Sequence, residues 1–164
     1  MKTYTDWLAA TLASDAAEGR GALPTWISSL RPTACVIGPA LTALVSQDDN
    51  LAVRQAIGAP SARGSVLVVA SGSSSRTAVI GGLLALEMQK RGVLALVTDG
   101  LVRDSREIRQ LPFDVWCRGV TPIASHKNGP AIVSGVVSIG GTVIHDGDLI
   151  IADDDGVVVW PKEQ

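Results

Sequence analysis

The chain has 164 residues, of which 46% are hydrophobic and 18% are charged, and its formal net charge at pH 7 is −2. This composition predicts one compact domain with a substantial core and excludes an intrinsically disordered chain. The small negative charge gives no basis for nucleic acid or an anionic membrane as a partner. The high apolar content instead predicts that some surface is buried between subunits.

The sequence predicts neither a membrane span nor a signal peptide. Its apolar runs are short and broken by glycines or charges, and the first stretch contains Asp6 without a cleavage-site pattern. Cys35 and Cys117 lack metal-type spacing, so we expect buried thiols rather than a disulfide. Reduced cysteines are typical of a cytoplasmic protein.

The first predicted element is an amphipathic helix over Thr3 to Ala16. Trp7, Leu8 and Leu12 fall near helical spacing with Ala16, so they define one apolar face. The flanks are not basic, and we therefore expect this face to pack against the protein rather than a membrane.

Short elements follow in the next segment. Trp26 to Leu30 fits a helical turn that ends at Arg31-Pro32. Ala34 to Val45 predicts two strands separated at Gly38-Pro39, because a proline suits an edge or a bulge better than a central strand. A short helix is predicted over Leu51 to Ile57.

The centre of the chain predicts a strand–helix–strand unit. Val66 to Val69 is continuously apolar, as expected of a strand covered on both faces. Ala78 to Arg91 predicts a helix that Gly92 caps, and Val93 to Thr98 predicts the next strand. Together these elements predict a βαβ unit with a right-handed crossover.

The second half is predicted to be rich in strands. A short helix is expected over Asp104 to Gln110, a strand over Val115 to Cys117 and a loop over Gly119 to Asn128. Four further strands are predicted over Ala131 to Val137, Thr142 to His145, Leu149 to Ala152 and Val157 to Trp160. The predicted fold is therefore a single α/β domain with a β-rich second half.

The segment Gly81-Gly82-Leu83-Leu84 has two explanations that the residues alone leave open. Each glycine costs a helix about 1 kcal/mol relative to alanine, so a reason for the pair is needed. One explanation is close packing of the helix on a strand. The other is that the helix begins here and offers free N–H groups and a positive dipole end to a carboxylate.

The pair Arg103-Asp104 is the sharpest local signal. Asp104 and Glu107 fit a capping box, and Arg103 can pair with Glu107 at i, i+4. However, an arginine after an apolar strand also stands where α/β sheets bind ligands. There Arg103 would clamp a carboxylate and Asp104 would ligate Mg²⁺ or Mn²⁺, provided that the turn bends between them.

Other polar residues are predicted to be structural. Ser71 to Ser75 is interpreted as a flexible turn, Asp99 as a turn former and Asp153 to Asp155 as a hairpin turn. His126 and His145 stand in no recognisable metal or nucleophile motif. Core packing is expected for the four tryptophans, Trp7, Trp26, Trp116 and Trp160.

The order of segments resembles the RraA-like family. The resemblance rests on VIGPALTA, VLVV…AVIGGLLA, RGVLALVTDGLVRD and GGTVIHDGDLIIADDDGVVVWP, and it spans Ser14 to Pro161. The family includes 4-hydroxy-4-methyl-2-oxoglutarate aldolase/oxaloacetate decarboxylase enzymes and regulators of ribonuclease E. It implies a swivelling β/β/α-type sandwich, with the layer order α/β/β/α, that assembles as a trimer or a hexamer with sites at subunit interfaces.

The resemblance also implies roles for residues. In its aldolase branch, the amides of Gly81, Gly82, Leu83 and Leu84 would hold the pyruvate carboxylate together with Arg103. Asp104 would bind Mg²⁺ or Mn²⁺. The metal would act as a Lewis acid that stabilises the enolate left by retro-aldol cleavage or by loss of CO₂, and no lysine Schiff base is needed.

The sequence departs from the aldolase pattern at three places. Gly82 replaces an acidic residue that usually follows the first glycine, and Ala70 replaces an aspartate after the first strand. The sequence also ends at Gln164, before the C-terminal helices that carry an acidic side chain to a neighbour's site in many members. No general acid or base is therefore identified.

Three functions compete. The expected one is a metal-dependent carbon–carbon lyase on a small 2-oxo acid, which Arg103 and Asp104 favour. The second is a non-catalytic ring-shaped regulator that binds a protein such as a ribonuclease, because regulators are similarly short but typically lack the acidic residue after the arginine. The third is a related site with different chemistry, such as hydrolysis or isomerisation.

Overall fold

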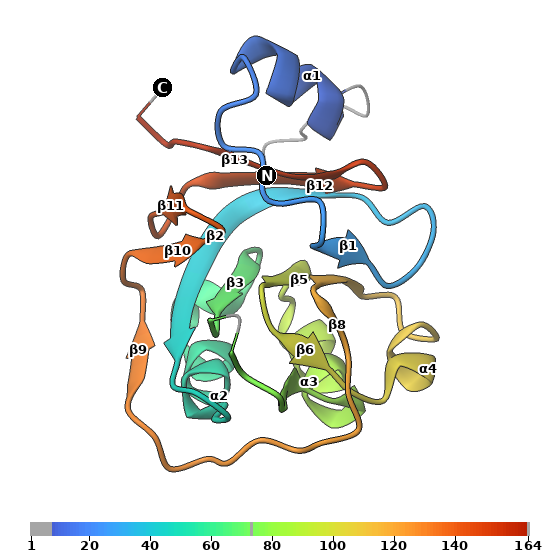
Figure 1. The fold of residues 1–164 in the computed structure, drawn as a ribbon, viewed down its shortest axis with the longest axis vertical. Coiled ribbons are helices and arrows are strands. Elements are labelled where there is room, and N and C mark those ends of the chain that lie inside the picture. The colour runs from blue at the N-terminus through green and yellow to red at the C-terminus, as the bar shows by residue number, and fades with distance from the viewer. Residues whose placement is uncertain (1–7, 73, 164) are drawn as a thin grey trace.

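The computed structural model describes residues 8–72 and 74–163 (Figure 1). Its helices are α1 (Ala10–Ala16), α2 (Leu51–Gly58), α3 (Gly82–Arg91) and α4 (Ser105–Ile108), with a 3-10 turn at Pro60–Ala62. The strands of the first half are β1 (Ser28–Ser29), β2 (Val36–Val45), β3 (Val66–Ala70), β4 (Ala78–Ile80), β5 (Ala95–Thr98) and β6 (Leu101–Val102). The strands of the second half are β7 (Asp114–Cys117), β8 (Gly119–Val120), β9 (Ala131–Val133), β10 (Val137–Ile139), β11 (Thr142–Ile144), β12 (Leu149–Asp153) and β13 (Gly156–Trp160).

Within the described residues these strands form three sheets. The large sheet has the order β1-β7-β5-β3-β2-β12-β13, and β9 also pairs with β2. A small parallel sheet has the order β4-β6-β8, and β10 and β11 form a hairpin.

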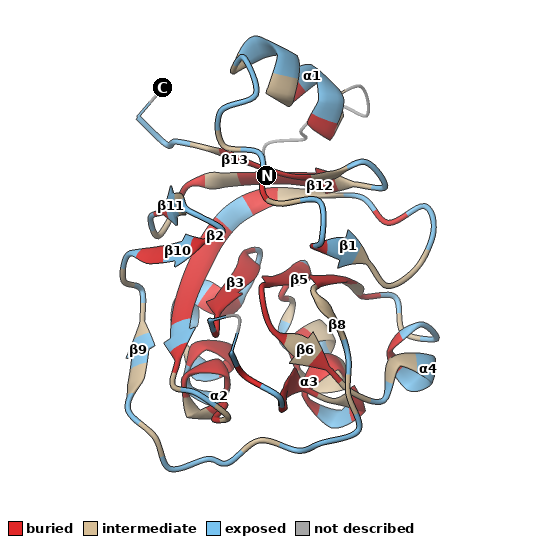
Figure 2. Ribbon diagram, in the orientation of Figure 1, coloured by how far each residue is buried: buried red, intermediate tan, exposed pale blue. Residues whose placement is uncertain are grey.

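The strand β3 lies at the centre of the core, and all five of its residues are buried (Figure 2). Leu67 and Val69 belong to the apolar cluster that contains the residues of α2 and α3, whereas Val66 and Val68 belong to the cluster on the opposite face. Because strand side chains alternate between faces, both faces must be covered to bury such a run. The prediction of a doubly covered strand is confirmed.

The core clusters define four layers. Ile57 of α2 and Met88 of α3 pack on one face of the central strands. On the other face, Ile139 and Ile150 bring the β10–β11 hairpin and the β12–β13 strands over the sheet. Ala13 of α1 packs on the outside of β12 and β13. The layer order helix–sheet–sheet–helix confirms the sandwich that the resemblance implied.

The strand β2 joins the two sheet layers and corrects one prediction. It runs unbroken through Gly38 and Pro39, pairing antiparallel with β12 over Val36–Pro39 and parallel with β3 from Ala40. The break expected at Gly38-Pro39 is therefore wrong. Pro39 is tolerated because Ala40 N donates to Asp148 O, the residue just before β12, at 2.7 Å. In an antiparallel ladder, successive residues point their N–H groups alternately toward the partner strand and away from it. The nitrogen of Pro39 therefore points away from β12, and because pairing with β3 begins only at Ala40, no hydrogen bond is lost.

The βαβ unit is confirmed, with a changed helix start. β3 and β5 pair in parallel and flank α3 in the sequence. Gly92 caps the helix in the left-handed conformation, with φ +81°. However, Ala78–Ile80 form β4 instead of the first helical turn, and α3 begins at Gly82. The three apolar residues are buried by pairing with β6, which outweighs their local helical spacing.

The second half is β-rich as predicted, with three boundary corrections. The short helix is limited to Ser105–Ile108, and the expected loop after Gly119 contains β8. The single strand expected over Ala131 to Val137 is two strands, because Ser134 has a left-handed φ of +58° and turns the chain from β9 to β10. Asp154 and Asp155 form the turn of the β12–β13 hairpin, as predicted.

Two N-terminal predictions need correction. Residues 3–7 of the predicted first helix lie outside the described residues, and the helix begins at Ala10. Its buried residues are Ala10 and Ala13. Of the predicted apolar face, Leu8 packs against this cluster, whereas Leu12, 48% exposed, and Ala16 do not belong to it, so the predicted face is only partly correct. The helical turn expected after Trp26 is a turn followed by β1, which pairs with β7. No helix in the described part of the chain combines the length and apolarity needed to cross a membrane.

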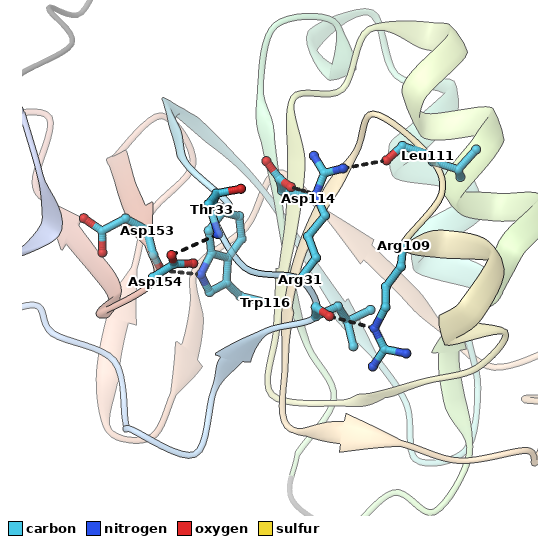
Figure 3. Close-up of polar contacts among 9 residues, drawn as sticks. Arg31, Thr33, Arg109, Leu111, Asp114, Trp116, Asp153 and Asp154 are labelled. Atoms are coloured by element: carbon cyan, nitrogen blue, oxygen red, sulfur yellow. Dashed lines mark hydrogen bonds and ion pairs between the residues drawn. The ribbon is translucent and has the colours of Figure 1, made fainter.

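The predicted burial of cysteines and tryptophans is partly correct. Cys117 and Trp116 are buried on β7, and the Trp116 indole N–H donates to Asp153 O at 2.9 Å (Figure 3). Cys35 is exposed and Trp26 is 43% exposed, which contradicts the core positions expected for both. Trp160 is half-buried and Trp7 lies outside the described residues.

Side-chain contacts fix the segment between β1 and β2 onto both layers (Figure 3). Arg31 Nε donates to Asp114 Oδ1 at 2.6 Å, at the start of β7. Thr33 N donates to Asp154 Oδ2 at 2.9 Å, in the hairpin turn. Charge-assisted hydrogen bonds of this kind hold the connecting segment in place.

Candidate functional site

The small sheet β4-β6-β8 carries the candidate site. Its strands follow β3, β5 and β7 in the sequence and repeat their spatial order. Arg103 N donates to Ile80 O at 3.0 Å, so the residues after β6 lie beside those after β4. This arrangement brings polar residues to the carboxyl ends of parallel strands, where α/β proteins bind ligands.

The helix α3 begins at this edge. Gly81 is the N-cap residue in an extended conformation, and Gly82, Leu83 and Leu84 form the first turn. The first N–H groups of a helix have no partner within the helix and form its positive end. Of the two explanations left open for the glycine pair, the structure therefore supports a helix entrance.

Arg103 and Asp104 reach the same entrance because the chain bends between them. Asp104 has a left-handed φ of +57°. Its Oδ2 accepts a hydrogen bond from Gly82 N at 3.0 Å and lies 3.5 Å from Arg103 Nε. The bend that a shared site required is present.

The capping box predicted for α4 is wrong. Asp104 is its N-cap residue but makes no side-chain capping bond to it. The carboxylate of Asp104 is instead directed to the neighbouring helix, where it satisfies the first N–H of α3. The ion pair that the structure gives Arg103 is with Asp104 rather than with Glu107.

The glycine pair also leaves room for the carboxylates of α4. A Cβ atom at Gly81 would lie 2.5 Å from Asp104 Oδ2, and one at Gly82 would lie 2.5 Å from Glu107 Oε2. Neither contact is sterically possible without movement. The glycines therefore make space for the side chains of Asp104 and Glu107. The alternative explanation, close packing of the helix on a strand, is not what the structure shows.

These groups line a cavity of about 350 Å³. Of the predicted site residues, it includes Gly81, Leu83, Leu84, Arg103 and Asp104, while Gly82 lies beneath Asp104 and Glu107. The remaining lining residues are Asn50, Arg54, Ala78, Ile80, Glu107, Ala124, Ser125 and Lys127.

Sequence reasoning missed Asn50, Arg54 and Lys127. Asn50 and Arg54 come from the start of α2 and Lys127 from the loop after β8, and backbone pairing joins the two segments. Asn50 N donates to His126 O at 3.0 Å, and the same loop is joined to β4 because Ala78 N donates to Ile123 O at 2.9 Å. No local motif marks these residues, because separate backbone segments bring them together.

The cavity carries more positive than negative side chains. Arg54, Arg103 and Lys127 are cationic, whereas Asp104 and Glu107 are acidic. A small anion with two carboxylates would find complementary charge here, and a bound divalent cation would strengthen that attraction.

Asp48 and Asp49 hold the loops beside the cavity. Asp49 accepts three backbone hydrogen bonds, from Leu51, Asn128 and Gly129. Burial raises the pKa of Asp49, but these donors outweigh it, so the pKa lies below the ordinary value. The Arg76 N–H is the main cause of a lowered pKa at Asp48. Both carboxylates therefore favour the charged form as structural acceptors.

The other polar candidates lie outside this cavity. Asp99 is buried and accepts hydrogen bonds from Ser71 N at 2.6 Å and Gly72 N at 3.2 Å, which ties the residues after β3 to the end of β5. Residue 73 of the predicted flexible turn lies outside the described residues. His126 and His145 are exposed and do not line the cavity. Within the residues that the structure describes, no three His, Cys, Asp or Glu side chains gather as a metal cluster.

Comparisons with known proteins agree with this fold. The family model described as RraA-like, Aldolase/RraA, matches residues 10–159. A curated protein of Halalkalibacterium halodurans, "Putative 4-hydroxy-4-methyl-2-oxoglutarate aldolase", is 40% identical over 155 residues, covering 94% of this chain and 73% of that protein.

Solved structures show the same architecture. The RNA-processing inhibitor RraA from Thermus thermophilus superposes with a TM-score of 0.85 at 32% identity, covering 94% of this chain and 93% of that one. An S-adenosylmethionine:2-dimethylmenaquinone methyltransferase from Geobacillus kaustophilus gives 0.86 at 31% identity, covering 94% and 96%. The fold is thus the mixed α/β fold of RraA proteins. The chain belongs to the RraA-like family.

Proposed function

We propose that this protein is a carbon–carbon lyase that releases pyruvate from a small 2-oxo acid by retro-aldol cleavage or decarboxylation. The observation that carries this proposal is the convergence of Arg103, Asp104 and the first turn of α3 on one cavity. The curated relative of Halalkalibacterium halodurans, named after an aldol cleavage, supports the same class of reaction.

Arg103 and the entrance of α3 are suited to a carboxylate. A guanidinium group binds carboxylates through two parallel hydrogen bonds. The N–H groups of Leu83 and Leu84 lie in the first turn of α3, where helix N–H groups lack partners within the helix. Together these donors would orient the 2-oxo carboxylate beside Asp104.

Asp104 fits a divalent cation. Mg²⁺ and Mn²⁺ prefer hard oxygen ligands, and Mg²⁺ commonly uses one or two carboxylates with substrate and water oxygens completing its shell. Asp104 offers such a carboxylate at the cavity, next to the group that would hold the substrate. When bound, the cation supplies Lewis-acid stabilisation of negative charge that develops on the substrate.

The remaining cations of the cavity favour a dicarboxylate. Arg54 and Lys127 line the cavity with Arg103 and can pair with a second carboxylate. Oxaloacetate and 4-hydroxy-4-methyl-2-oxoglutarate both carry one. Ala70 is buried at the end of β3 and supplies no acidic group. The acidic side chains that line the cavity are those of Asp104 and Glu107.

The test follows pyruvate release from both substrates, with Mg²⁺, with Mn²⁺ and with EDTA. We expect metal-dependent turnover that falls at least about 100-fold in Asp104→Ala, because the cation site is lost. Arg103→Lys should mainly raise KM, since lysine cannot make the bidentate contact. Asp155→Ala, in the β12–β13 turn, is a matched control and should retain wild-type turnover. Turnover no higher than that of the metal alone on both substrates would contradict the proposal.

A non-catalytic regulator is the second candidate, favoured by the structural similarity to the RNA-processing inhibitor RraA. This function predicts binding to an endoribonuclease and slower cleavage of a structured RNA, unchanged by Asp104→Ala. Inhibition with no pyruvate release would favour the regulator, whereas pyruvate release without inhibition would favour the lyase.

We also propose that the protein assembles as a trimer or a hexamer. The exposed apolar side chains include Leu83, which is 84% exposed at the cavity, and Val120, Ile132, Val136 and Val143. Exposed apolar side chains of this size are available for contacts between subunits. Light scattering on the purified protein measures the mass directly, and a monomer at micromolar concentration would contradict this assembly.

A further inference from the structure

Glu107 is an acidic residue of the cavity whose position calls for an explanation. Its Oε2 occupies the space that a side chain at Gly82 would need, 2.5 Å from the ideal Cβ position. Asp104 Cβ lies 3.5 Å from the same point. Two carboxylate side chains, one from the N-cap residue of α4 and one from α4 itself, thus lie over the same helix entrance, one above each glycine.

This arrangement gathers two acidic side chains at one helix entrance, since both have atoms within 3.5 Å of the ideal Cβ position at Gly82. Adjacent carboxylates repel one another unless a positive group lies between or beside them. The positive end of α3 and Arg103 account for one of them, because Gly82 N donates to Asp104 and Arg103 Nε lies 3.5 Å from the same oxygen. The ion pairs and hydrogen bonds that the structure gives the described residues assign no cationic partner to Glu107.

A second, independent observation points to a ligand in the same cavity. Asn50 lines it and is only 6% exposed. Its Nδ2 donates to Val79 O at 3.2 Å, whereas its Oδ1 is a buried oxygen without a hydrogen-bond partner among the described residues. A buried acceptor normally has a partner. A residue of the cavity lining therefore carries an oxygen acceptor that the described residues leave unsatisfied.

We propose that Glu107 is the second acidic residue of the cation site, acting with Asp104 to bind the divalent metal directly or through its hydration shell. The inference rests on the proposed function, since it takes the metal site at Asp104 as given. It assigns the glycine pair a purpose: Gly81 makes room for one carboxylate and Gly82 for the other. An oxygen-rich site with two carboxylates suits Mg²⁺ or Mn²⁺.

The experiment measures Mn²⁺ binding without substrate, by the loss of the free Mn²⁺ electron paramagnetic resonance signal. Glu107→Gln keeps the size of the side chain and removes its charge. We expect this variant to bind Mn²⁺ about 10-fold more weakly, and Asp104→Asn to lose more. Glu87→Gln is the matched control, because Glu87 lies on α3 and pairs with Arg91 on the exposed surface. It should bind as the wild type does.

A double variant that moves the carboxylate from position 107 to position 82 tests whether Mn²⁺ binding depends on a carboxylate at this place rather than on Glu107 itself. Glu107→Ala vacates the space above Gly82, so Gly82→Asp can then be accommodated in the same protein. An aspartate in the first turn of a helix is also favourable for the helix. We expect the double variant to bind Mn²⁺ more tightly than Glu107→Ala alone. Circular dichroism and thermal unfolding establish that each variant is folded.

The outcomes separate the two proposals. Wild-type affinity in Glu107→Gln, with weakened binding in Asp104→Asn, overturns the role of Glu107 and leaves the metal site intact. Equal binding by the wild type and Asp104→Asn, or no binding by the wild type, overturns both. Weakened binding in Glu107→Gln with a recovery in the double variant supports the proposal.

Discussion

The substitution Gly81→Ala probes the site with a single methyl group. Gly81 has φ −129° and ψ −174°, a conformation that alanine adopts without strain. Its new Cβ would lie 2.5 Å from Asp104 Oδ2 and 2.9 Å from Arg103 Nε, whereas real Cβ contacts are essentially never below 3.0 Å. The Asp104 carboxylate must therefore move by about 0.5 Å, and the Arg103 side chain must also shift.

The expected result is a loss of function with little loss of stability. Both clashing groups are side-chain atoms, so the fold can adapt. Alanine at an N-cap position costs about 1 kcal/mol, which for a chain of this size lowers Tm by roughly 2–4 °C. A displacement of 1 Å in a catalytic group can cost about 100-fold in rate, and half that displacement predicts about a 10-fold loss of kcat/KM.

The assay combines kcat/KM for pyruvate release, Mn²⁺ affinity and thermal unfolding. Gly58→Ala is the control, because Gly58 ends α2 and a Cβ there meets nothing within 4 Å. We expect wild-type activity and unchanged or higher Tm for the control. Full activity and full Mn²⁺ affinity in Gly81→Ala would refute the assigned geometry, since the two site residues would then tolerate the displacement.

Two further predictions concern acid stability and thiol reactivity. The pKa values of Asp48 and Asp49 are lowered from an ordinary value of 3.8, so their contribution to stability is complete above that value and is lost as pH falls through the folded-state values. Urea unfolding between pH 6 and 3 should therefore show a shallower acid loss for Asp49→Asn than for the wild type, and parallel curves would contradict this. Burial raises the pKa of the Cys117 thiol to about 11, so iodoacetamide at pH 8 should label the exposed Cys35 in the native protein and Cys117 only after unfolding. Peptide mass spectrometry checks this, and equal labelling of both in the native protein would be inconsistent with it.

Local signals made much of the fold predictable from the sequence. The unbroken apolar run of β3 required cover on two faces, and Gly92 marked the end of α3. Arg103 and Asp104 could be selected because they directly follow an apolar strand and a DG turn. In each case the residues that create the signal are neighbours in the sequence.

The missed features depend on contacts between distant segments. Arg54 and Lys127 enter the cavity from segments more than 70 residues apart, which no spacing rule relates. The capping box failed for a similar reason: Asp104 had a stronger use at the first N–H of α3 than at its own helix. Pro39 was misjudged because the change of partner along β2, which frees its nitrogen, is a property of the assembled sheet.

The small sheet β4-β6-β8 is expected to be less stable against local opening than the large sheet. Its strands are only two or three residues long, so few ladder bonds hold the ends of β4 and β6 together. In the large sheet β2 has ten residues and β3 has five, and β3 is buried on both faces. Local opening of a protein follows its least protected hydrogen bonds, so we expect the pairing of β4 with β6 beside the helix entrance to open before the core does. A ligand that bridges α3 and α4 would then suppress this local opening. Binding would order the site while the large sheet and its core stay as they are.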